Sequence, residues 1–284
     1  MGARVAAAVL LAGWMLPSAA AASGHGPVFG AATPTLGKGG WSFDQAWMGA
    51  RVRDAENEQV LRTMLGFGIT KDVQISMSLP VELGRSDSLP MGRMMATMSS
   101  RREAEVLAGW RVHTRPVADT ARFETTVYLG ATAPLQRRTD GASSDPAVSG
   151  TIASGYASRV HYFWLGGSYH RTLGGADDRT PDVKTYSVVY GYRPAPLRLD
   201  YPKPDLRFFV ETIGELAGPR HSVHASAARS SSHTLMAGPT ALLLYKAYGL
   251  SGGVLLPVYQ RIGREQSKER LRFAINVSYF FWVK

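Results

Sequence analysis

Residues 271–283 read LRFAINVSYFFWV, and this stretch decides the fold. Every odd position carries an apolar side chain, whereas the even positions read Arg, Ala, Asn and Ser until Phe280. Successive side chains of a β-strand point to opposite faces, and a helix would not sort residues with a period of two. The stretch therefore predicts a strand with one apolar face and one polar face.

The same alternation recurs along the chain. Residues 73–83 place Val, Ile, Met, Leu, Val and Leu at odd positions, and residues 104–112 and 123–129 repeat the pattern. Strand boundaries read from a sequence are good to a few residues. Twelve strands are predicted, at 40–50, 58–69, 72–83, 103–114, 121–133, 150–158, 160–171, 183–193, 205–216, 234–246, 249–261 and 270–283.

Residues 235–259 are the strongest candidate for a helix, because Lys246 is their only charged residue. Pro239, Pro257 and the glycines at 249, 252 and 253 interrupt this apolar run. Proline removes a backbone donor and glycine weakens a helix interior, so the composition favours two strands that meet at a tight turn.

The connections between the expected strands differ in length. Those after the even-numbered strands are short or proline-rich, whereas those after the odd-numbered strands include long polar stretches at 84–102, 134–149, 172–182 and 217–233. Outer-membrane barrels have short periplasmic turns and long external loops, and closure lets every backbone group pair within the lipid. The sequence thus predicts an all-β fold, a transmembrane antiparallel β-barrel of about 12 strands.

The first residues predict export. Arg4 precedes an apolar run at 5–16, and the small residues at 20–22 fit a cleavage site, so residues 1–22 read as a signal peptide. Residues 23–39 are then expected as an N-terminal periplasmic segment and 40–284 as the barrel. The chain has no cysteine, so stability must come from packing and hydrogen bonds.

The net charge of +10 suggests anionic partners. For an exported chain these are outer-membrane lipid and lipopolysaccharide rather than nucleic acid. Aromatic residues begin the first expected strand and end the last one, where amphipathic rings prefer the membrane interface, here the periplasmic rim. The expected location is the outer membrane of a Gram-negative bacterium.

The sequence also resembles a known family. The stretch GHGPVFGAATPTLGKGGWSFDQAWMG at 24–49, after a signal peptide and before the alternating strands, is similar to exported outer-membrane transporters related to the meta-pathway phenol-degradation protein. The resemblance implies a barrel that passes small compounds, hydrophobic or aromatic ones included. It names no solute and brings no catalytic residues.

If the apolar faces meet lipid, the opposite faces line the lumen and carry charges of both signs. One interpretation is a constriction that selects polar or amphipathic solutes. The other is an internal ion-pair network that fills a narrow barrel. The candidate lumen residues are Arg62, Glu105, Arg111, Arg122, Glu124, Arg207, Glu211 and Arg272.

The expected loop at 84–102 contains methionines with helical spacing, which predicts a short helix with one apolar face. Such a face can pack over the barrel mouth or contact a hydrophobic solute, and thioethers can also bind Cu(I). These candidate contact residues are Met91, Met94, Met95 and Met98.

Enzymatic and metal sites find little support. Ser168 and His170 share one face of an expected strand, but same-face neighbours lie about 7 Å apart, too far for a direct hydrogen bond. No nucleophile elbow, phosphate loop or zinc-protease motif occurs. We therefore predict no enzyme, no cofactor and no metal site.

These observations predict an outer-membrane channel or facilitator for passive passage of a small-molecule solute. The alternatives are a structural or lipid-binding barrel with a closed lumen and a metal-efflux accessory protein.

Overall fold

A computed structural model describes residues 26–53, 58–82, 93–95, 98–99, 103–135, 146–173, 181–199, 201–218, 231–262 and 268–283. No helix in this part of the chain is both long and apolar enough to cross a membrane.

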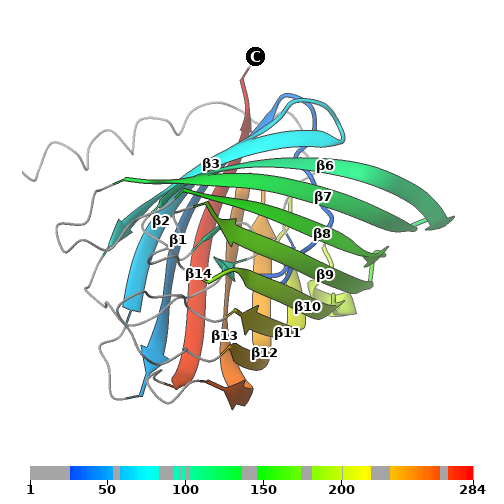
Figure 1. The fold of residues 1–284 in the computed structure, drawn as a ribbon. Coiled ribbons are helices and arrows are strands. Elements are labelled where there is room, and N and C mark those ends of the chain that lie inside the picture. Colours follow the sequence, from blue (N-terminus) through cyan, green and yellow to red (C-terminus); the bar gives the residue numbers. More distant parts are fainter. Residues whose placement is uncertain are drawn as a thin grey trace, which may run out of the picture.

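Twelve strands of the described residues form one closed antiparallel barrel (Figure 1). Each strand pairs with its neighbours in sequence, and the first strand closes the barrel against the last. The barrel strands are β1 (Gly40–Val52), β2 (Glu58–Gly68), β3 (Val73–Glu82), β6 (Glu103–Ala118), β7 (Ala121–Pro134), β8 (Ala147–Ala157), β9 (His161–Thr172), β10 (Val183–Tyr192), β11 (Asp205–Ala217), β12 (Ser232–Tyr245), β13 (Tyr248–Arg261) and β14 (Glu269–Trp282).

The predicted twelve-stranded barrel is confirmed, with small shifts in strand ends. The largest shift is in β6, which continues to Ala118 although the sequence predicted an end at residue 114. Register shifts at 111/113 and 116/118 let this strand carry Pro116, because bulges tolerate a residue without a backbone donor. The stretch 235–259 forms two strands, as predicted, with Lys246 in the turn at φ 53°.

The two ends of the barrel differ as the loop lengths predicted. Both barrel termini and the short connections 69–72, 119–120, 158–160 and 246–247 lie at one end, together with 193–204, which holds the 3₁₀ turn η1 (Ala195–Leu197). We call this end the turn end, and we call the opposite end, where the longer connections leave the strands, the loop end.

Side chains alternate across the wall of the barrel. Outward positions in every strand carry large apolar residues such as Leu129, Ile152 and Val210, which are more than half exposed. Inward positions carry buried small, polar and charged residues such as Ser78, Thr126 and Arg272. An apolar exterior around a polar interior is the pattern of a barrel built for lipid.

Aromatic rings gather at the turn end, at the first and last strands. Trp41 stacks on Phe281 with ring centroids 6.1 Å apart, and Phe67 and Tyr279 extend the group. Phe280 points inward instead and is buried in the core. The predicted ring of aromatics at this rim is therefore formed by the outward residues only.

Charge placed on the apolar exterior should destabilise the barrel according to depth. We expect Ile152→Arg, at the middle of β8, to lower the free energy of unfolding by about 2–4 kcal/mol, because a cation at the bilayer midplane loses its hydration. Val117→Arg, near the turn end, should cost about 0–1 kcal/mol. Denaturant titration in lipid vesicles compares the two, and equal costs would contradict a membrane-spanning exterior.

The methionine-rich connection corrects the sequence prediction of a helix. Its described parts, β4 (Arg93–Met95) and β5 (Met98–Ser99), pair as a small antiparallel hairpin in which Met95 lies opposite Met98. A helix of this length is marginal by itself in water, so helical spacing of a few methionines does not fix a helix. Met94 lies in β4, and Met91 lies outside the described residues.

Candidate functional site: the plugged lumen

The N-terminal segment lies inside the barrel. Residues 28–36, which we call the plug segment, run through the lumen instead of lying in the periplasm as the sequence predicted for 23–39 (the dark-blue coil in Figure 1). Gly39, with φ 74°, turns the chain from the lumen into β1 at the turn end. The reason is chemical, because the segment offers backbone donors to the buried carboxylate of Glu211, which burial would otherwise penalise.

Glu211 on β11 holds the beginning of the plug segment. Its side chain has no exposed area and accepts backbone N–H bonds from Val28 at 2.7 Å, Phe29 at 2.8 Å and Gly30 at 2.6 Å. The hydroxyl of Thr240 donates a fourth hydrogen bond at 2.5 Å. A carboxylate that accepts several N–H bonds is one of the stronger noncovalent clamps in a low-dielectric interior.

A second set of polar contacts holds the middle of the segment. The Thr33 hydroxyl donates to Glu124 at 3.1 Å and accepts from the indole N–H of Trp164 at 3.1 Å. The hydroxyl of Thr126 donates to the carbonyl of Thr33 at 2.6 Å. On the same side, Tyr128 donates to the carbonyl of Ala32 at 3.0 Å. Thr33 is therefore fixed on both its side chain and its backbone.

The wall is shaped to fit this segment. A Cβ at Gly166 of β9 would lie 2.6 Å from the Cβ of Ala31, so only glycine lets the segment approach. The residual cavity between the segment and β8–β10 has a volume of about 20 Å³ and is lined by Phe29, Gly166 and Ser187, among others. That space holds roughly one water molecule. The lumen at this level is filled by the chain itself.

Next to the plug segment lies a buried aromatic group. Tyr162 and Trp164 of β9 stack with centroids 5.3 Å apart, and Phe209 of β11 lies 6.1–6.2 Å from both. The Arg207 guanidinium lies 5.4 Å from the centroid of the Tyr162 ring. These inward-facing aromatic rings give the lumen an apolar wall next to the plug segment.

The eight predicted lumen residues all belong to inward-facing positions, but they do not form one ring. Arg62 is fully buried on β2, donates to Ser78 at 3.0 Å and to the carbonyl of Glu103 at 2.8 Å, and lies 3.9 Å from Glu105. This group is separate from the Glu211 clamp. Its hydrogen bonds cross from β2 over β3 to β6.

A second ionic group lies toward the turn end. Arg111 donates to Asp72 at 2.7 Å and to Glu124 at 3.0 Å. Arg122 also pairs with Glu124, at 2.8 Å, but its side chain is 48% exposed and thus weakly held. Glu124 therefore serves both this group and the plug segment.

Two further predicted residues lie at opposite ends. Arg272 on β14 makes paired contacts with Glu215, at 2.7 and 3.1 Å, and with Glu269, at 2.9 and 3.0 Å, near the loop end. Near the turn end Arg207 pairs with Asp205 at 2.9 Å, and Arg193 contacts the same carboxylate. Because these groups lie at different levels, they brace the wall at several heights.

Sequence reasoning missed the partners that the plug segment requires. Thr33, Trp164, Ser187 and Thr240 carry no charge and stand out in no motif. The one signal was the stretch at 24–49, which is rich in Gly, Pro and Thr and lacks strand alternation before residue 40. Among the described residues, no group of three or more His, Asp or Glu side chains could hold a metal ion.

The chain was compared with known protein families, sequences and structures. No protein-family model and no curated protein sequence matches the chain. An outer-membrane channel from Pseudomonas putida F1 has 13% identity and a TM-score of 0.63, covering 88% of this chain and 98% of that one. The NanC porin has 7% identity and a TM-score of 0.47, covering 86% of this chain and 100% of that one. OprD from Pseudomonas aeruginosa has 11% identity and a TM-score of 0.41, covering 86% of this chain and 93% of that one. At 13% identity the likeness to the Pseudomonas putida F1 channel shows a shared fold.

Proposed function

We propose that the protein is an outer-membrane channel for passive passage of small compounds, and that displacement of the plug segment opens it. The observation that carries the proposal is a closed barrel whose lumen is filled by its own N-terminal segment through hydrogen bonds and packing. No disulfide pins the segment, since the chain has no cysteine. A plug held only by noncovalent contacts can leave and return.

The outer-membrane location rests on the exterior. Large apolar side chains face outward around the whole barrel, and exposing them to water would cost much free energy. The structurally similar protein from Pseudomonas putida F1 is an outer-membrane channel, which supports the same location and role. Contact with outer-membrane lipid follows from the location, and lipopolysaccharide is a further proposed partner.

The lumen supports a class of solute. When the plug segment leaves, the rings of Tyr162, Trp164 and Phe209 become accessible, and the Arg207 guanidinium beside them adds a positive charge. Such a wall suits small hydrophobic or aromatic compounds. The resemblance to transporters related to the meta-pathway phenol-degradation protein supports this choice, which remains a proposal about solute class.

A second candidate function is a structural barrel whose lumen stays closed. Its support is the packed interior beside β1, β12 and β14, where Met48, Met236, Leu255 and Ala274 form one buried apolar cluster with Val28. Buried apolar contacts stabilise the closed form by about 25 cal/mol for each Å² removed from water. The alternative of a metal-efflux accessory protein stays a prediction, as do the absence of catalysis and of a cofactor.

A reversible lock separates the two candidates. A Cβ at Gly30 would lie 3.5 Å from the Cβ of Ser187, within the range of a disulfide, but it would clash with Val189. We therefore expect Gly30→Cys with Ser187→Cys and Val189→Ala to form a cross-link between the segment and β10.

In planar bilayers the oxidised variant should show no openings and the reduced variant should conduct. Val189→Ala without the cysteines is the control, and it should conduct under both conditions. If neither wild type nor the reduced variant ever conducts, the channel proposal fails and the structural barrel stands. If the oxidised variant conducts as well as the reduced one, the plug segment is not the gate.

A further inference from the structure

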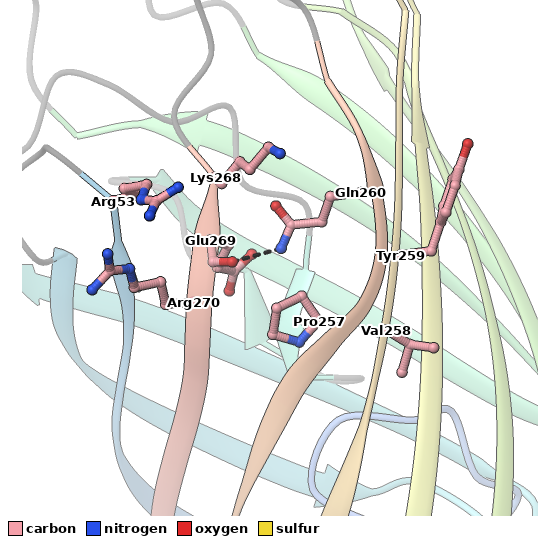
Figure 2. A pocket seen from close by; sticks show the side chains of 8 residues that line it. All are labelled: Arg53, Pro257, Val258, Tyr259, Gln260, Lys268, Glu269 and Arg270. Carbon is pink, nitrogen blue, oxygen red and sulfur yellow. Dashed lines mark hydrogen bonds between the residues drawn. The ribbon is translucent and has the colours of Figure 1, made fainter.

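The barrel wall is split between β13 and β14 near the loop end. Among the described residues, pairing of these two strands stops at Leu255 opposite Arg272. Beyond that point β13 still pairs with β12 as far as Arg261, and β14 still pairs with β1 as far as Glu269. The two strands therefore diverge from one another while each keeps its outer neighbour, as Figure 2 shows.

Both strands carry a bulge at the split. On β13 the register passes from Tyr259 to Pro257, which leaves Val258 without a partner on β12. On β14 it passes from Leu271 to Glu269, which leaves Arg270 without a partner on β1. Pro257 also lacks the backbone N–H that a ladder needs. Bulges re-aim side chains and end pairing, so the split is built into the two strands.

A cavity of about 350 Å³ occupies the split. It lies between Pro257 and Gln260 on β13 and Lys268 and Glu269 at the start of β14, with Arg53 at its side (Figure 2). The Gln260 amide donates to the backbone carbonyl of Glu269 at 2.5 Å and bridges the two strands. One side chain thus replaces part of the missing ladder while the cavity stays open.

The charge at this cavity is positive. Arg53, Lys268 and Arg270 are exposed and line it. Glu269 is the one acidic residue among the described residues of the lining, and its carboxylate points to Arg272, which holds it at 2.9 and 3.0 Å. The lining therefore presents three cations whose charge Glu269 does not neutralise. Guanidinium groups pair with phosphate oxygens in a bidentate way.

The cavity lies at the depth of a membrane interface. Tyr259 contacts His233 with ring centroids 5.3 Å apart, and His233 shares a 3.0 Å hydrogen bond with the hydroxyl of Tyr186. These partly exposed rings form an outward group at the loop end, opposite the aromatic rim of the turn end. Amphipathic rings of this kind mark the headgroup level, where water and lipid phosphates can satisfy the unpaired strand edges.

We propose that the split between β13 and β14 is a binding site for the phosphorylated headgroup of an outer-leaflet lipid of the lipid A class. Arg53, Lys268 and Arg270 bind the phosphate, and Pro257 and Val258 contact the adjoining apolar part of the lipid. The proposal rests on the outer-membrane location and not on conduction through the lumen. A lipid-facing cavity with three cations fits an amphipathic anion better than a freely diffusing one.

The test uses the detergent-purified full chain and native mass spectrometry with bisphosphorylated lipid A. The variant carries Arg53→Gln, Lys268→Gln and Arg270→Gln. Each cation near an anionic lipid surface is worth roughly fivefold in binding, so the three substitutions should weaken binding about a hundredfold. The control carries Lys71→Gln, Arg115→Gln and Lys203→Gln, which remove three exposed cations at the turn end and should leave binding unchanged.

Heat-dependent gel mobility checks that every variant remains a folded barrel. Monophosphorylated lipid A should bind more weakly than the bisphosphorylated form. The site would be overturned if the variant with Arg53→Gln, Lys268→Gln and Arg270→Gln (the split variant) bound lipid A as well as the wild type does. It would also be overturned if the split variant and the turn-end control lost binding equally. Displacement of the lipid by inorganic phosphate at matched concentration would show a site for free anions and overturn the lipid assignment. Single-channel recording of the split variant is independent, since openings at the wild-type level are compatible with the proposed site.

Discussion

Glu211→Gln should turn a largely closed barrel into a frequently open one. The carboxylate accepts three backbone N–H bonds from the plug segment and one from Thr240, whereas an amide has a single acceptor oxygen and turns its NH₂ group toward donors. Loss of charge-assisted bonds at a buried site costs about 2–4 kcal/mol. The population with the segment displaced should rise on the order of a hundredfold.

Single-channel recording in planar bilayers measures this effect as open probability. Glu215→Gln is the matched control, because Glu215 lies on the same face of β11 but contacts Arg272 instead of the plug segment. Its open probability should stay near that of wild type. If Glu211→Gln leaves the openings unchanged while the barrel is folded, the clamp does not hold the channel closed.

Arg272→Met should be the most destabilising single substitution in the wall. Arg272 is 2% exposed and pairs with both Glu215 and Glu269, whose side chains are 14% and 10% exposed. Its loss leaves two neighbouring carboxylates without their shared cation. Removing one partner from a buried ionic group costs about 3–5 kcal/mol.

Denaturant unfolding in lipid vesicles measures that cost. Arg270→Met, two residues away at an exposed bulge, should change the free energy of unfolding by less than about 0.5 kcal/mol. Adding Glu215→Gln and Glu269→Gln to Arg272→Met should recover much of the lost stability, because no uncompensated charge then remains. Full stability of Arg272→Met by itself would show that the ionic group does not brace β11 against β14.

The plug segment and the split are two separate features of one barrel. The first lies in the lumen and consists of residues 28–36. The second lies in the wall between β13 and β14 and is bridged by Gln260. They are separable by mutation, since Glu211 faces the lumen and Arg270 is exposed at the loop end. The variants proposed above test each feature without altering the other.

The sequence predicted the wall of this barrel well because the wall follows a local rule. In 271–283 each side chain faces lipid or lumen according to its parity, and the same rule holds on the other strands except where a bulge shifts the register. It also predicted that Arg62, Glu124, Glu211 and Arg272 face inward. The prediction of a methionine helix was wrong because helical spacing in a short stretch does not exclude a hairpin.

By itself the sequence determined the alternating strands, their number and the sorting of short turns and long loops to opposite ends. These features depend on residues that are neighbours along the chain. Only the tertiary structure decided that residues 28–36 enter the lumen, since Glu211 lies 183 residues from Val28 and their hydrogen bond exists only after the barrel closes. The same holds for the split, because a missing ladder is a property of two strands together and of neither strand alone.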